Sequence, residues 1–132
     1  MKFNFTNLGL LDIFQVLKKF DHVSGDLGYA IKQTKDNIIV ALNDFVAQRD
    51  ELVKKYEFIT NDGELDSADI DPEKYQNFLD ELTPIVDKSV EVEFVQVSQD
   101  VYNKSNTYNK DCTVRDYDVL EVFFVEGKFV QN

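Results

Sequence analysis

The feature that most constrains the fold is a long amphipathic segment over residues 26–58. Ile31, Ile38, Phe45 and Leu52 recur at intervals of seven residues, and this spacing places apolar side chains on one face of an α-helix. At 1.5 Å per residue the helix is roughly 45 Å long, which is more than the core of a small domain needs. We therefore expect one long central helix whose ends project or reach a partner.

Two short stretches have the alternating pattern of strands. Apolar and polar side chains alternate in residues 2–6 and 89–98, which is typical of strands with one buried face. Between the first strand and the long helix, residues 8–20 have the helical period, and Asn7 is positioned to cap them. We expect the two strands to pair with each other in a small antiparallel sheet.

A third amphipathic helix is predicted after residue 70. Asp71 supplies a capping acid, Pro72 suits the first helical position, and Glu73 adds negative charge near the positive end of the helix dipole. Thr83 and Pro84 are expected to kink or end this helix, because proline lacks the N–H that a helix interior needs.

The C-terminal part is less regular. Residues 101–111 are polar and are predicted to form a surface loop. Thr113, with Asp116 three residues later, matches a capping box, so residues 113–124 are predicted to form the last helix, followed by a short extended tail. Their valine content also suits a strand that turns at residues 126–128, and that alternative stays open.

These patterns together predict a mainly helical α+β fold. Three to four amphipathic helices surround one long helix, and the N-terminal strand forms a small antiparallel β-sheet with the strand over residues 89–98. A chain of 132 residues, of which 43% are apolar, is expected to fold as a single domain over residues 1–132.

The net charge of −11 comes from one segment. Residues 57–100 contain thirteen acidic and two basic residues, whereas the rest of the chain holds twelve of each. Duplex nucleic acid requires clustered lysine and arginine, so we expect no direct nucleic-acid partner. Carboxylates on a rigid helical frame can instead occupy a protein groove that binds phosphates, because charge complementarity speeds association. The competing interpretation is that the acidity serves solubility alone.

The acidic side chains proposed to contact a partner belong to this segment. They are Asp62, Glu64, Asp66, Asp69, Glu73, Glu91 and Glu93.

Catalytic and metal-binding motifs are missing from the sequence. The chain has one histidine, His22, and one cysteine, Cys112, with no glycine-rich phosphate loop and no GxSxG motif. If Gly63 were the turn glycine of a calcium-binding EF-hand, Phe58 and Thr60 would occupy two ligand positions. The motif needs carboxylate or amide oxygens at these positions, so the sequence does not match it. We therefore predict a non-enzymatic protein without cofactor or metal.

Five segments carry a resemblance to a known family: residues 2–7 (KFNFTN), 51–56 (ELVKKY), 61–64 (NDGE), 82–94 and 116–120. Their order resembles small proteins of unassigned function encoded by phages and prophages of low-GC Gram-positive bacteria. The resemblance implies an α+β protein of viral origin and no known chemistry.

Three function hypotheses follow. The leading hypothesis is an acidic phage accessory protein that acts in the host cytoplasm, where it binds and inhibits a host nuclease or other nucleic-acid-handling or antiviral defence enzyme. The alternative is a virion or tail-assembly protein that forms a homo-oligomer through the long helix or an exposed strand edge. The third hypothesis is a small-molecule sponge, which requires a pocket with convergent polar groups. No membrane role is expected, because no apolar run reaches the roughly 20 residues that span a bilayer.

Overall fold

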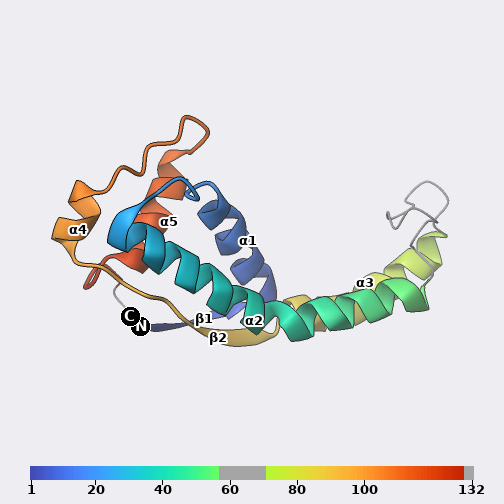
Figure 1. The fold of residues 1–132 in the computed structure, drawn as a ribbon. Helices are drawn as coiled ribbons and strands as arrows, with labels where there is room; N and C mark the ends of the chain where they lie inside the picture. The colour runs from blue at the N-terminus through green and yellow to red at the C-terminus, as the bar shows by residue number, and fades with distance from the viewer. Residues whose placement is uncertain (57–70, 130–132) are drawn as a thin grey trace.

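A helical body with a projecting pair of helices is seen in the computed structural model (Figure 1), which describes residues 1–56 and 71–129. The elements follow the chain in the order β1 (Lys2–Thr6), α1 (Asn7–Lys18), α2 (Gly25–Lys55), α3 (Pro72–Val86), β2 (Ser89–Glu93), α4 (Gln99–Lys104) and α5 (Val114–Phe124). The predicted mainly helical α+β fold is confirmed.

The 31-residue helix α2 runs through both parts of the molecule. Its first half packs against α1, the sheet and α5, and its second half lies beside α3. The helix ends at Lys55, and Tyr56 donates its backbone N–H to the carbonyl of Leu52 at 3.0 Å. The long central helix is therefore confirmed, and residues 57 and 58 of the prediction lie outside the described residues.

Phenylalanine rings fill the core between the sheet and α5. Phe94 is fully buried, and its ring centroid lies 5.2 Å from that of Phe3, 5.7 Å from Phe5, 5.6 Å from Phe123 and 5.5 Å from Phe124. These rings are tilted or edge-on to one another, which is the favoured arrangement of aromatic pairs. Phe94 thus connects the sheet to the last helix.

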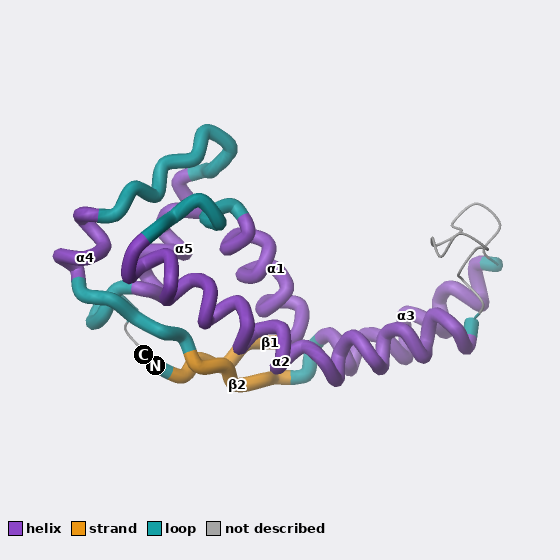
Figure 2. Tube along the Cα trace, viewed as in Figure 1, coloured by secondary structure: helices purple, strands orange, loops and turns teal. Residues whose placement is uncertain are grey.

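The two strands lie side by side along one side of the body (Figure 2). They are antiparallel, with Lys2 opposite Glu93 and Thr6 opposite Ser89, as predicted. However, β2 ends at Glu93, so the prediction of a strand to residue 98 is wrong. Beyond β2 the backbone N–H of Val95 donates to Thr34 Oγ1 of α2 at 3.0 Å, which turns the chain away from β1.

The helix α1 is capped by Thr6 and not by Asn7. Thr6 has extended backbone angles, and its Oγ1 accepts a hydrogen bond from the Gly9 N–H at 3.0 Å. Asn7 is buried inside the helix start, where its Nδ2 donates to the carbonyl of Ile85 at 2.8 Å. Asn7 therefore joins α1 to the end of α3.

The helix α3 starts as predicted but does not end at Pro84. The Asp71 side chain accepts a hydrogen bond from the Glu73 N–H at 2.9 Å and caps the helix. Backbone bonding resumes beyond the proline, where Asp87 donates to the carbonyl of Thr83 at 3.0 Å. The helix therefore continues to Val86.

The C-terminal part contains one helix that was not predicted. Residues 101–104 belong to α4, whose cap Ser98 accepts a hydrogen bond from the Val101 N–H at 3.2 Å, so the loop prediction is wrong there. The last helix is confirmed as α5, with a capping box between Thr113 and Asp116. The tail beyond Phe129 lies outside the described residues.

Candidate functional site

The candidate binding surface is the helical arm, which we define as residues 46–56 of α2 and 71–83 of α3. Both helices extend away from the body (Figure 1). A small second core holds them together, in which Val53 and Phe78 are buried. The partly buried side chains around these two are Leu52, Tyr56, Leu79 and Leu82. The arm thus keeps its shape with a thin apolar seam and leaves most of its surface exposed.

A polar contact near the end of α2 reinforces this seam. Glu81 of α3 accepts hydrogen bonds from Lys55 Nζ at 2.7 Å and from the Tyr56 hydroxyl at 2.6 Å. The bonds from Lys55 and Tyr56 hold the pKa of the Glu81 carboxyl below its usual range, and the bond to Glu81 raises the pKa of Tyr56. Glu81 therefore serves the arm's own structure.

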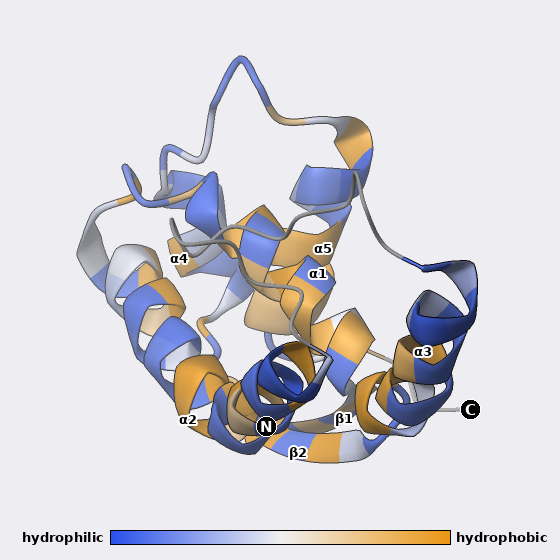
Figure 3. Ribbon diagram, turned by 90° about the vertical axis from the view of Figure 1, so that its right-hand side faces the viewer, coloured by the Kyte–Doolittle hydropathy of each residue, from blue (hydrophilic) through white to orange (hydrophobic). Residues whose placement is uncertain are grey.

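The outward face of α3 carries exposed acidic side chains. Glu73 and Asp80 are exposed and lie seven residues apart, which places them on the same side of the helix. Viewed along the arm, hydrophilic residues cover the outer side of α3 and hydrophobic ones face the molecule (Figure 3). Residues 57–70, which connect α2 to α3 in the sequence, contain five acidic residues and no basic one.

The structure separates the predicted contact residues that it describes. Glu73 lies in the first turn of α3, whereas Glu91 and Glu93 lie on β2 in the body. The 15 residues of α3 span about 20 Å between these two places. The other four predicted residues, Asp62, Glu64, Asp66 and Asp69, lie outside the described residues.

The two acids of β2 lie beside the cations of Met1 and Lys2, at the start of β1. Glu91 Oε1 lies 3.6 Å from Lys2 Nζ, and Glu93 Oε1 lies 3.2 Å from the N-terminal amine of Met1. These pairs neutralise the outer face of the sheet locally. Sequence reasoning missed Asp80, although its spacing of seven residues from Glu73 is a signal that the two share a helix face.

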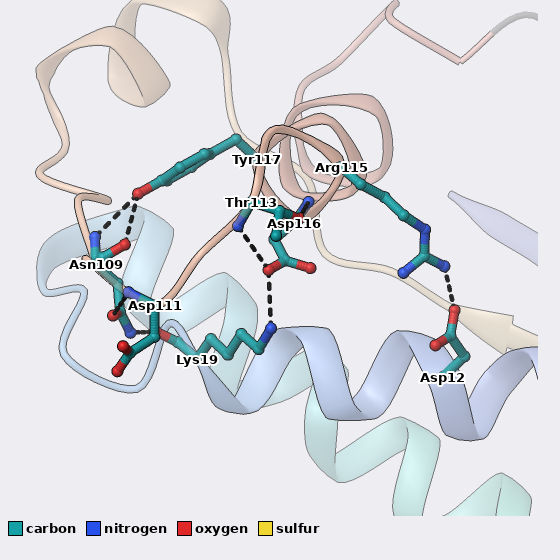
Figure 4. Close-up of polar contacts among 8 residues, drawn as sticks. All are labelled: Asp12, Lys19, Asn109, Asp111, Thr113, Arg115, Asp116 and Tyr117. Atoms are coloured by element: carbon teal, nitrogen blue, oxygen red, sulfur yellow. Dashed lines mark hydrogen bonds and ion pairs between the residues drawn. The ribbon is translucent and has the colours of Figure 1, made fainter.

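A second polar cluster joins the loop before α5 to the end of α1 (Figure 4). Asp116 Oδ2 lies 2.9 Å from Lys19 Nζ and accepts the Thr113 N–H at 3.0 Å. Asn109 Nδ2 donates to the carbonyl of Lys19 at 2.8 Å, and the Tyr117 hydroxyl donates to the carbonyl of Asn109 at 3.0 Å. Each of these polar groups has a partner within the cluster. The cluster therefore has a structural role, because it holds the loop before α5 against the end of α1.

We expect Asp116→Asn to destabilise the protein by about 1–2 kcal/mol at neutral pH, through the weakened capping box and the lost ion pair. Hydrogen bonds from the Thr113 backbone and from Lys19 lower the pKa of Asp116 below its usual 3.8. A lowered pKa stabilises the folded state above pH 3.8, and this contribution is lost as pH falls through the folded pKa. Urea unfolding at several pH values measures it.

The exposed neighbour Asp118 of the same helix provides the matched control. Asp118→Asn should leave the free energy of unfolding within about 0.5 kcal/mol of that of the unaltered protein. The difference between the Asp116→Asn variant and the unaltered protein should shrink in strong acid. A difference that stays constant down to the lowest pH would contradict the assignment.

A groove of about 540 Å³ lies beside the connection from α1 to α2. Its lysines are already paired, Lys35 with Asp21 at 2.5 Å and Lys32 with Asp36 at 3.2 Å. Two cations and two anions that cancel one another do not converge on a charged ligand. The groove therefore does not favour the small-molecule sponge over a protein-binding role.

Comparison with protein-family models, characterised proteins and solved structures finds no match to this chain. The resemblance to phage proteins therefore stays a prediction. Within residues 1–56 and 71–129, no cluster of three or more metal-ligating side chains is found, and no helix is long and apolar enough to cross a bilayer.

Proposed function

We propose that the protein binds a basic surface of another protein through its helical arm and thereby inhibits that protein. The observation that carries the proposal is the projection of the arm from the body with Glu73 and Asp80 exposed on one side of α3. The proposed target is a host enzyme that handles nucleic acid or acts in antiviral defence, in the host cytoplasm. Such enzymes present clustered cations for phosphate groups.

The pairing of acids elsewhere supports the choice of the arm. Several acidic side chains of the body form ion pairs with nearby lysine or arginine, as in Asp12 with Arg115, Asp36 with Lys32 and Glu121 with Lys128. The negative charge of these acids is therefore balanced locally. The arm and its connecting residues 57–70 keep an excess of acids, so the arm is where a cationic partner is attracted most strongly.

The shape of the arm also suits insertion into a groove. Two adjacent helices make a narrow rod, and the rise between Glu73 and Asp80 is about 10 Å along α3. Carboxylates on such a rod are held in a defined order because the second core keeps α3 against α2. A partner groove lined by cations is then blocked both by charge and by the bulk of the helices.

The double variant Glu73→Lys/Asp80→Lys is expected to reduce partner binding by at least about tenfold, because four units of charge change on the contact face. The tagged protein is used to capture partners from a lysate of a low-GC Gram-positive bacterium at several salt concentrations, with quantitative mass spectrometry. The enriched enzyme is then purified, and its activity is assayed with added protein.

A matched control carries the same charge change on the body, Asp118→Lys/Glu126→Lys, where both side chains are exposed. The control should bind and inhibit like the unaltered protein. Equal losses in the two double variants, or an enzyme that binds without loss of activity, would contradict the proposal.

A virion or tail-assembly role is the second candidate. Exposed apolar side chains on the outer face of α2 favour it, since Tyr29, Ile39 and Val40 are 62%, 49% and 69% exposed. Mass spectrometry of purified virus particles distinguishes the two roles, because an assembly protein is found in the particle at fixed stoichiometry and an inhibitor is not.

A further inference from the structure

One edge of the two-stranded sheet is open. The hydrogen bonds from the Phe94 N–H to the Met1 carbonyl at 2.8 Å and from the Asn7 N–H to the Lys88 carbonyl at 2.9 Å set the alternation of the ladder. Odd-numbered residues of β1 therefore bond to β2, and the peptide groups of Lys2 and Asn4 point away from it. In the part of the chain that the structure describes, these outward groups make no backbone hydrogen bond.

The opposite edge of the sheet is covered by α2. Asn37 Nδ2 donates to the carbonyl of Glu93 at 3.0 Å, and Thr34 Oγ1 accepts the Val95 N–H at 3.0 Å. At this end of β2 the outward carbonyl of Glu93 and the N–H of Val95 are thus bonded to α2, whereas among the described residues no such bond covers the outward groups of Lys2 and Asn4. An unpaired strand edge is a template for pairing with another strand.

Apolar surface adjoins the open edge. A shallow hollow of about 590 Å³ beside Thr6 is lined by residues of α1, among them Leu8 and Leu11. Leu8 is 58% exposed although it lies in the first turn of a helix whose inner face is core. A partner that extended the sheet would reach this leucine, so backbone pairing and apolar burial would act together.

The sequence of β1 is compatible with pairing to itself. In an antiparallel pair centred on Asn4, Asn4 faces Asn4 of the second copy, and Lys2 faces Thr6 of the second copy. No like charges are then directly opposite, and Phe3 faces Phe5 across the new pair. Residues 1–20 contain three basic residues and one acidic residue, so this region opposes self-association less than the acidic remainder of the chain.

We propose that β1 of this chain pairs antiparallel with β1 of a second copy, with Asn4 opposite Asn4, to form a homodimer with a continuous four-stranded sheet. Leu8 and Leu11 of each copy lie beside the junction and lose water there. The dimer is independent of the proposed inhibition, since it uses β1 and α1 and leaves both arms exposed.

Cysteine cross-linking tests the register directly. Residues opposite each other in a hydrogen-bonded antiparallel pair have Cα atoms about 5.5 Å apart, within the range of a disulfide. In a Cys112→Ser background, Asn4→Cys should therefore form a covalent dimer with oxidised glutathione. Lys2→Cys should stay monomeric, because the two Lys2 positions are offset by four residues, about 14 Å along the strands.

Two further variants distinguish pairing at this edge from non-specific association. Asn4→Pro removes an outward N–H that β2 does not use, and Leu8→Lys places charge in the hollow. Each variant should raise the dimer dissociation constant, measured by sedimentation equilibrium, at least about tenfold. Val40→Lys, on the exposed face of α2, should leave it unchanged. Circular dichroism confirms that the variants are folded.

Two results overturn the dimer itself, and a third overturns its register. One is a protein that stays monomeric up to about 1 mM. The other is a dimer that Val40→Lys disrupts while Asn4→Pro and Leu8→Lys do not, which assigns the contact to α2. Equal cross-linking of Asn4→Cys and Lys2→Cys contradicts the register in the same way.

Discussion

Phe94→Ala is expected to lower the free energy of unfolding by about 4 kcal/mol. The Phe94 side chain is fully buried, and its ring lies against four other phenylalanine rings from β1 and α5. Alanine removes the apolar contacts and leaves a cavity at the junction of sheet and helix, which the surrounding rings fill only in part. Urea unfolding followed by circular dichroism measures the loss.

A conservative variant keeps the test informative if the alanine variant does not fold. Phe94→Leu retains most of the volume and should destabilise by about 1–2 kcal/mol. Tyr108→Ala is the control for the loss of an aromatic ring, because that side chain is 72% exposed, and it should change stability by no more than about 0.5 kcal/mol. Similar effects of Phe94→Ala and Tyr108→Ala would show that Phe94 is not at the centre of the core.

The main elements of the fold were predictable because apolar periodicity records which face of each element is buried. The seven-residue spacing of Ile31, Ile38 and Phe45 predicted α2, and all three side chains are buried. The capping residues Asp71 and Thr113 predicted the starts of α3 and α5, since their side chains satisfy backbone N–H groups that the helix leaves unpaired.

Tertiary contacts determine the features of the fold that apolar periodicity did not predict. The helix α4 has six residues and no buried side chain, so it leaves no apolar pattern to recognise. The end of β2 depends on Thr34, a residue of α2 that takes the N–H of Val95. The sequence marks that end only by a shift in phase, since apolar residues stand at even positions up to Phe94 and at odd positions, Val95 and Val97, after it.

The candidate site was predictable in its charge but not in its geometry. The excess of acids in residues 57–100 is visible in the sequence, yet Glu73 and Glu91 are placed far apart by the length of α3. The strand register, which opposes Lys2 to Glu93, brings β2 acids beside cations from the other end of the chain. Pairing across such a distance in sequence depends on the fold.

Gly28→Ala is expected to destabilise the protein by about 3 kcal/mol. A Cβ atom at this position would lie 2.2 Å from the carbonyl oxygen of Val23 and 2.8 Å from its carbonyl carbon. These are backbone atoms of the connection between α1 and α2, so rotation of a side chain does not relieve the overlap. Val23 is itself buried in the same core cluster as Phe20 and Leu27, so moving its backbone disturbs the core at the start of α2.

Gly25→Ala separates steric overlap from backbone strain at the same helix start. Gly25 has φ 72°, which an L residue adopts at some cost, but no atom lies within 4 Å of its added Cβ. Its replacement should destabilise the protein by about 1 kcal/mol. Thermal and urea unfolding should therefore show that Gly28→Ala is clearly less stable than Gly25→Ala. If both variants lose the same stability, close packing of Gly28 on Val23 does not hold the connection in place, and the strain of the turn accounts for both effects.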